Sequence, residues 1–280
     1  MVLGRRTAVM GIVNVTPDSF FDDSRQLKPE QAVDHALEMV ETGADIIDIG
    51  GESTRPGARP VPIEEELRRT ETVISELRRQ SDVLISIDTR KSRVAERALD
   101  LGADLVNDIS SLTADPAMAQ IIAQANAGVV LMHMKGTPET MQKDPFYSDV
   151  IVEMKEFMET AVHQAEASGI SPQSIILDPG IGFGKAAEHN LQILNRLQAL
   201  SCLEKPLLVG TSRKSFIGRV LDLPPEGRLW GTAATVVAAI IKGAHIVRVH
   251  DAAEMVQVSR VADAILNESL RGIRDAGVQL

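Results

Sequence analysis

The sequence predicts an α/β protein built as a closed (β/α)₈ barrel of parallel strands, a TIM barrel, with its active site at the C-terminal ends of the strands. Eight short, β-rich apolar runs alternate with longer stretches of helical period, which is the pattern of repeated βα units. Dividing 280 residues among eight runs gives 35 per unit, close to the ~30 that a strand and its crossover need. The total is near the ~250 residues usual for such barrels, so counting favours a closed barrel over an open, doubly wound sheet.

The expected strands follow one another at regular intervals. In order they span 8–13, 45–49, 83–87, 104–106, 128–132, 174–177, 207–209 and 245–249. Among the intervening segments, 149–169 carries apolar residues at spacings of three and four, including Val150, Met154 and Met158, which predicts a helix with one buried face. No Gly/Ser-rich or Pro-rich linker divides the chain, so residues 1–280 are expected to form one domain.

Composition excludes several classes of partner. Lys and Arg number 29 against 39 Asp and Glu, a net charge of −10, which argues against nucleic acid. The most apolar later run, 233–241, stops at Lys242, well short of the ~20 residues that span a bilayer, so no membrane partner is expected. Cys202 is the only cysteine and no secretion signal is recognisable, which together predict a cytoplasmic protein.

Every expected strand is followed by polar residues, and in a parallel barrel chemistry collects at that end. Helix caps and turns explain many of them, and we prefer that explanation for Thr89, Asp108 and Asp251. It does not suit the cations, which are Arg55, Lys214, Arg248 and His250. Their convergence on one rim of an acidic protein predicts an anionic substrate. A further anion could bind at the helix start near 212–215.

Two acids and an amide follow strands three, four and six. Asp88, Asn107 and Asp178 would meet near the floor of the mouth, where carboxylates accepting paired N–H bonds suit a flat heterocycle with an amidine-like edge. A metal site and the acid pair of a glycoside hydrolase are alternatives. The segment 180–185 is not a phosphate loop, because Pro179 and Ala186 stand where a Walker A sequence needs Gly and Ser or Thr.

Five segments, 14–20, 50–57, 178–185, 212–215 and 248–251, together resemble the dihydropteroate synthase family. The resemblance runs from about Val9 to Leu270. It implies an enzyme of folate synthesis that joins 6-hydroxymethyl-7,8-dihydropterin diphosphate to 4-aminobenzoate and releases pyrophosphate and 7,8-dihydropteroate. It also implies a Mg²⁺ cofactor, a homodimer and inhibition by sulfonamides.

The resemblance also implies roles for individual residues. Those carried over as catalytic are Lys214, Arg248, His250, Asp88 and Asp178, and Asn14 is the metal ligand. The pterin would lie among Asp88, Asn107, Met132, Asp178, Phe183 and Lys214, and the diphosphate among Thr54, Arg55, Arg248 and His250. The 4-aminobenzoate pocket would comprise Phe20, Pro56, Phe183, Ser212 and Lys214. The loops that hold Pro17, Phe20 and Pro56 are expected to act as a lid that excludes water.

One segment departs from the family. The first loop continues Phe21-Asp22-Asp23-Ser24 where the family usually has Ser-Asp-Gly-Gly, which puts the closing motion of the loop in doubt. This departure keeps one alternative open, a non-catalytic pterin-binding homologue. A second alternative, which does not depend on the loop, is a corrinoid-dependent methyltransferase that binds methyltetrahydrofolate in a similar barrel with similar acids. The dimer surface and the response to sulfonamides do not follow from the sequence.

Overall fold

A computed structural model describes residues 3–16, 29–54, 57–138 and 140–269. Eight parallel strands form one sheet in the order β6-β5-β4-β3-β2-β1-β8-β7, and a bridge between Leu177 and Leu207 joins its two edges. The strands are β1 Ala8–Asn14, β2 Ile46–Gly50, β3 Leu84–Asp88, β4 Leu105–Asp108, β5 Gly128–Met132, β6 Ile175–Asp178, β7 Leu208–Val209 and β8 Ile246–Val249. All eight predicted strands and the predicted barrel are confirmed.

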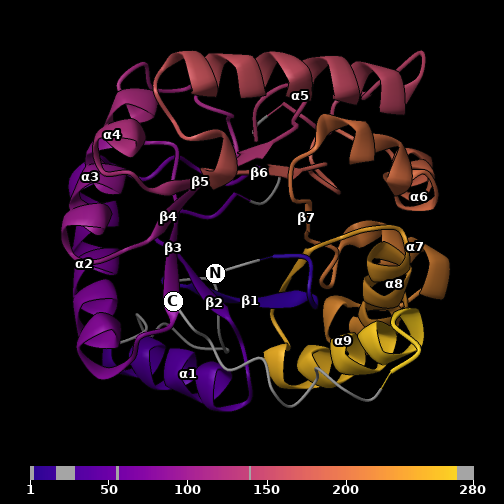
Figure 1. Cartoon of the computed structure of the whole chain (residues 1–280), viewed down its shortest axis with the longest axis horizontal. Helices are drawn as coiled ribbons and strands as arrows, with labels where there is room; N and C mark the ends of the chain where they lie inside the picture. Colours follow the sequence, from indigo (N-terminus) through magenta and orange to yellow (C-terminus); the bar gives the residue numbers. More distant parts are fainter. Residues whose placement is uncertain (1–2, 17–28, 55–56, 139, 270–280) are drawn as a thin grey trace.

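Helices surround the barrel on its outside (Figure 1). In the described part of the chain they are α1 Pro29–Glu41, α2 Ile63–Gln80, α3 Ser92–Asp100, α4 Met118–Gln124, α5 Val150–Ala167, α6 Ala187–Asn195, α7 Ser215–Leu221, α8 Leu229–Ile241 and α9 Ala252–Leu266. The helix predicted over 149–169 is α5, and the Asp149 carboxylate caps it by accepting from the Ile151 and Val152 amides. Within these residues, no helix combines the length and the apolar character needed to cross a membrane.

Side chains alternate between the inside of the barrel and the layer beneath the helices, as the two-residue period of a strand requires. The inner layer at the N-terminal side is apolar and includes Met10, Ile46, Val130 and Ile246. Two residues further along β2 and β8 come Asp48 and Arg248, so the inside of the barrel changes from apolar to charged toward the C-terminal ends. The core between strands and helices supports this charged layer.

Several strands continue through the polar residue that the sequence placed just after them. Asn14, Asp88 and Asp178 are each the last residue of a paired strand, opposite Gly50, Asn107 and Met132 respectively. Since the ladder fixes the backbone at these positions, the polar side chains are presented from rigid elements rather than from loops.

Candidate active site

Arg248 forms the centre of a buried ionic cluster in the barrel. Its Nε donates to Asp48 Oδ2 at 2.6 Å and its Nη2 to Asp88 Oδ2 at 2.7 Å. Asn107 Nδ2 donates to the same Asp48 oxygen at 3.1 Å. Three predicted site residues, Asp88, Asn107 and Arg248, are thus brought together by a fourth, Asp48, which the sequence analysis did not single out.

Two carboxylates share one guanidinium here, so one negative charge is left over. Burial raises the pKa of Asp88 to about 7, with Arg248 opposing and Asp48 adding to the shift. Burial would lower the pKa of Arg248, but the charges of Asp48 and Asp88 outweigh it and hold that pKa above its ordinary value. Burial thus opposes the charged form of Asp88, and a cationic partner at this end of the barrel would favour that form.

Two acceptors in this cluster have no donor among the described residues: Asp48 Oδ1 and Asn107 Oδ1, both buried. A buried acceptor without a donor costs free energy. These oxygens therefore favour a ligand that brings several N–H groups, as the sequence analysis predicted for a flat heterocycle.

Asp178 lies at the same end of the barrel as this cluster. Its Oδ1 accepts from the Gly180 amide at 2.7 Å, which fixes the rotation of the carboxylate. Burial raises the pKa of Asp178, while the Gly180 N–H and the charges of Lys214 and Arg248 oppose the shift. The acid therefore lies within electrostatic reach of both cations.

An apolar wall lies next to the acids. Ile109, Met132, Met141 and Phe183 form a separate buried cluster, and Lys214 Nζ lies 4.2 Å from the centroid of the Phe183 ring. A flat ring can pack on such a wall while its edge meets the acids. Ile109 and Met141 were not predicted, because they are ordinary apolar residues in loops.

The segment 178–185 is folded tightly against the chain that leaves β5. Gly180 has φ +63°, and a Cβ there would lie 2.0 Å from the His133 carbonyl oxygen. Lys185 is buried and its Nζ donates to the His133 and Phe183 carbonyls at 3.0 and 2.9 Å. Burial lowers the pKa of Lys185 to about 7, with Asp178 opposing and Lys214 adding to it. These contacts hold Asp178 and Phe183 in place.

Gly180→Ala is expected to lower the free energy of unfolding by about 3 kcal/mol or more, because strain at positive φ is added to a clash with backbone. Gly243 has φ +97° with nothing within 4 Å of a Cβ, so Gly243→Ala isolates the strain, at about 1 kcal/mol. Urea unfolding of both variants gives the comparison. Equal losses would show that the contact with His133 does not limit this position.

His250 differs from the cation expected at this position. Burial lowers its pKa to about 3, and the charges of Arg248 and Arg213 add to the shift. Its Nδ1 lies 2.9 Å from Ser212 Oγ, which also accepts from the His250 amide at 3.2 Å. Burial therefore favours the neutral imidazole, which keeps one N–H to donate.

Asn14 and Thr54 lie at the first two strand ends. A Cβ on Gly50 would lie 3.7 Å from Asn14 Oδ1 and 3.5 Å from Asp88 Cβ, so Asn14 and Asp88 flank Gly50. Thr54 is half-buried in the loop after β2. The predicted residues Phe20, Arg55 and Pro56 lie outside the described residues, as do Pro17 and the unusual segment 21–24.

The metal-binding prediction rests on Asn14. In the described ranges, no group of three or more His, Cys, Asp or Glu side chains is arranged to hold a metal. Asn14 offers an amide oxygen, which suits a hard cation that takes its other ligands from phosphate and water. The residues thus fit a Mg²⁺ ion that arrives with a diphosphate.

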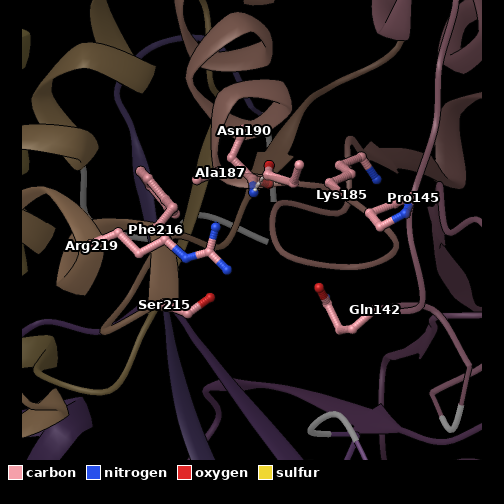
Figure 2. Close-up of a pocket in the computed structure, with 9 residues that line it drawn as sticks. Gln142, Pro145, Lys185, Ala187, Asn190, Ser215, Phe216 and Arg219 are labelled. Atoms are coloured by element: carbon pink, nitrogen blue, oxygen red, sulfur yellow. Dashed lines mark hydrogen bonds between the residues drawn. The ribbon is translucent and has the colours of Figure 1, made fainter.

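A cavity of about 120 Å³ opens between α6 and α7. Gln142, Lys185, Asn190, Ser215 and Arg219 line it, and Figure 2 shows the Ser215 hydroxyl and the Arg219 guanidinium pointing into it. Ser212 is buried against His250 and does not line this cavity. Ser215, and not the predicted Ser212, therefore faces this cavity.

The chain is similar to known proteins over most of its length. A family model described as pterin binding enzyme matches residues 10–250. The dihydropteroate synthase of Synechocystis sp. is 52% identical over 94% of this chain and 91% of its own length, and that of Escherichia coli is 46% identical over 92% of each. The crystal structure of the Yersinia pestis enzyme with a sulfonamide drug has a TM-score of 0.91 at 43% identity, covering 95% of this chain and 97% of its own.

A second structure bears on the site. The Xanthomonas albilineans dihydropteroate synthase with 4-aminobenzoic acid has a TM-score of 0.87 at 43% identity, covering 93% of each chain. The family model and these relatives cover most of the chain, and the two crystal structures share its fold. The chain belongs to the dihydropteroate synthase family of pterin-binding enzymes.

Proposed function

We propose that the chain condenses 6-hydroxymethyl-7,8-dihydropterin diphosphate with 4-aminobenzoate, giving 7,8-dihydropteroate and pyrophosphate. The single observation that carries this proposal is the placement of Asp88, Asn107 and Asp178 beside the Phe183 wall at the same barrel end as Arg248. Relatives with the same fold have been crystallised with 4-aminobenzoic acid and with 7,8-dihydropteroate. A transferase activity on these small molecules is the function that the site supports best.

The pterin would lie flat on Met132 and Phe183, with its N–H edge toward the acids. Asp178 and Asp88 accept from that edge, and the buried Asn107 Oδ1 gains a donor that no described residue supplies. Each hydrogen bond to a charged group can contribute ~1.5–3 kcal/mol. Lys214, whose Nζ lies over the Phe183 ring, would bound the slot on that side.

The reaction breaks the bond between the pterin methylene carbon and the diphosphate oxygen, and the leaving group keeps the electron pair. Arg248 and the N–H of a neutral His250 would stabilise the growing negative charge. Asn14 would hold Mg²⁺, which when bound neutralises part of the diphosphate charge. The arylamine nitrogen then bonds to the methylene carbon and releases a proton, and a neutral arylamine needs no strong general base for this attack.

A homodimer is part of the proposal, because apolar side chains are exposed on α7, α8 and the turn between them. Val220, Leu221, Leu223 and Trp230 are exposed, Trp230 to 80%. A patch of this kind favours burial against another protein surface, and a second copy is the occupant that the family resemblance implies. Light scattering coupled to gel filtration would measure the mass in solution. We also propose a cytoplasmic location, which the single cysteine of the sequence favours.

A pyrophosphate-release assay with both substrates tests the function. We expect pyrophosphate and 7,8-dihydropteroate in equal amounts, with release that requires 4-aminobenzoate and Mg²⁺. A sulfonamide should compete with 4-aminobenzoate. Pterin binding without pyrophosphate release would instead indicate a non-catalytic homologue, and methyl transfer from methyltetrahydrofolate to a corrinoid would indicate the methyltransferase alternative.

A further inference from the structure

Glu52 lies under the loop that follows β2 and is almost completely buried. Its Oε2 accepts from Lys91 Nζ at 2.6 Å and from the Val61 amide at 2.7 Å, and its Oε1 accepts from Arg90 Nη2 at 2.8 Å. The Val61 contact joins the two ends of loop 51–61 through one carboxylate. The two cations tie that loop to the segment that directly follows Asp88 and Thr89.

Glu66 on α2 belongs to the same network. It is fully buried, forms an ion pair with Lys91, and accepts from Thr89 Oγ1 at 2.7 Å. Lys91 therefore bridges two buried carboxylates. Arg90 supplies the second positive charge, so the charges balance within the network.

The start of the loop is also fixed against α2. Arg69 Nη1 donates to the Gly51 carbonyl at 2.8 Å. A Cβ on Gly51 would lie 2.9 Å from side-chain atoms of both Glu66 and Thr70, so the backbone here packs directly on the helix. On the far side, the Gly57 amide donates to the Pro138 carbonyl at 3.3 Å. Thr54 lies between these two fixed points.

A buried ionic network of this kind adds little net stability to a fold. A buried ion pair often stabilises no more than apolar residues of the same volume would, because both charges lose their hydration. Burial would raise the pKa of Glu52, but Lys91, the Val61 amide and Arg90 outweigh it and lower that pKa, so Glu52 stays charged. What the network provides is position, since each of its hydrogen bonds has one direction and one length.

We propose that Glu52 is a positioning residue for the part of the site that the loop after β2 contributes. Its carboxylate holds the described parts of this loop, 51–54 and 57–61, against the segment that follows Asp88, so that Thr54 lies at a fixed place relative to that acid. The inference rests on the proposed function, in which Thr54 contacts the diphosphate of the first substrate. Loss of the Glu52 charge would loosen the loop and leave the pterin slot unchanged.

The test compares Glu52→Gln with Glu64→Gln. Glu64 is on the same helix as Glu66 and pairs with Arg93 across to α3, but 72% of its side chain is exposed, so its substitution is a matched surface control. For Glu52→Gln we expect kcat/KM for 4-aminobenzoate to fall about 10²-fold, as misplacement by about 1 Å can cause. The Kd of 6-hydroxymethylpterin, measured by calorimetry, should stay within about twofold. Hydrogen exchange at the Val61 amide should become faster.

Two outcomes would overturn the proposal: kcat/KM for 4-aminobenzoate within twofold of the Glu64→Gln value, or an equal loss in pterin affinity. Failure of the function itself looks different, because the unsubstituted protein would then release no pyrophosphate. If Glu52→Gln does not fold, Arg90→Gln removes one donor to the same carboxylate from a partly exposed side chain. It should lower kcat/KM about tenfold, and an unchanged value there would count against the proposal.

Discussion

Replacing Arg248 with alanine is expected to lower kcat about 10³-fold. A preorganised donor to developing negative charge is worth ~3–4 kcal/mol in such sites, and Arg248 is the partly buried cation that would meet the departing diphosphate. Pterin affinity should fall much less, because the ring edge is bound by Asp178 and Asn107 as well. Stopped-flow measurement of pyrophosphate release and calorimetry with the pterin separate the two quantities. Equal losses in kcat and in pterin affinity would contradict a role at the leaving group.

The same variant should lose stability, by about 3–5 kcal/mol, since Asp48 and Asp88 are left buried without their shared partner. The loss in the free energy of unfolding should depend on pH. Burial raises the pKa of Asp88 in the folded protein to about 7, so the contribution of this acid is most favourable below its unfolded pKa of about 4 and declines until about pH 7. Without Arg248 the pKa rises further, and stability continues to fall above pH 7.

Urea unfolding at pH values from 5 to 9 would reveal this difference. Arg196→Ala is the control, because it removes a surface ion pair with Asp149 and should shift the curve by less than about 1 kcal/mol at every pH. The Arg248→Ala curve should diverge from that of the unsubstituted protein between pH 7 and 9. Parallel curves would mean that Asp88 does not depend on Arg248 for its charge.

Most of the barrel could be predicted because strand and helix periods are local. The runs from Ala8 to Val13 and from Gly128 to Met132 are apolar enough to be predicted as strands. The spacing of such runs gives the number of βα units. The prediction ended several strands too early, because Asn14, Asp88 and Asp178 are polar, although backbone pairing continues through them. At these positions the strand continues because its backbone pairs with the neighbouring strand, whatever the polarity of the side chain.

The charged layer was predicted in part. Asp48 interrupts an apolar run, Ile46-Ile47-Asp48-Ile49, and a charge inside a buried strand is a signal that could have been used. Its partner Arg248 is 200 residues away, and no local pattern links them. The neutral state of His250 likewise depends on burial beside Arg248 and Arg213, which only the folded chain brings together.

The two serines near α7 could not be told apart from the sequence. Both Ser212 and Ser215 precede or begin a helix, so the sequence treats them as equivalent candidates for an anion. In the fold, one turns inward to His250 and the other faces the cavity beside Arg219. Which one meets a ligand depends on the path of the backbone between them, where Arg213 has φ +56°.

Asp178→Asn is expected to weaken binding of 6-hydroxymethylpterin about 10²- to 10³-fold. The Gly180 amide needs an acceptor, so the asparagine oxygen will take the place of Oδ1 at 2.7 Å from it. The NH₂ group then points where the carboxylate accepted from the pterin, and two donors face each other. Loss of charge-assisted bonds and an unpaired buried donor together cost several kcal/mol.

The fold should not suffer from this change. Because burial raises the pKa of Asp178, the charged acid is a cost to the empty protein, and a neutral amide of equal size should leave the unfolding temperature unchanged or higher. Asp144→Asn is the control, since Asp144 is exposed with φ +50°, a conformation that Asn accepts. Calorimetry without 4-aminobenzoate isolates pterin binding. Unchanged affinity in Asp178→Asn would place the pterin edge elsewhere in the barrel, whereas lost affinity with unchanged or raised stability would show that this acid is kept for its substrate and not for the fold.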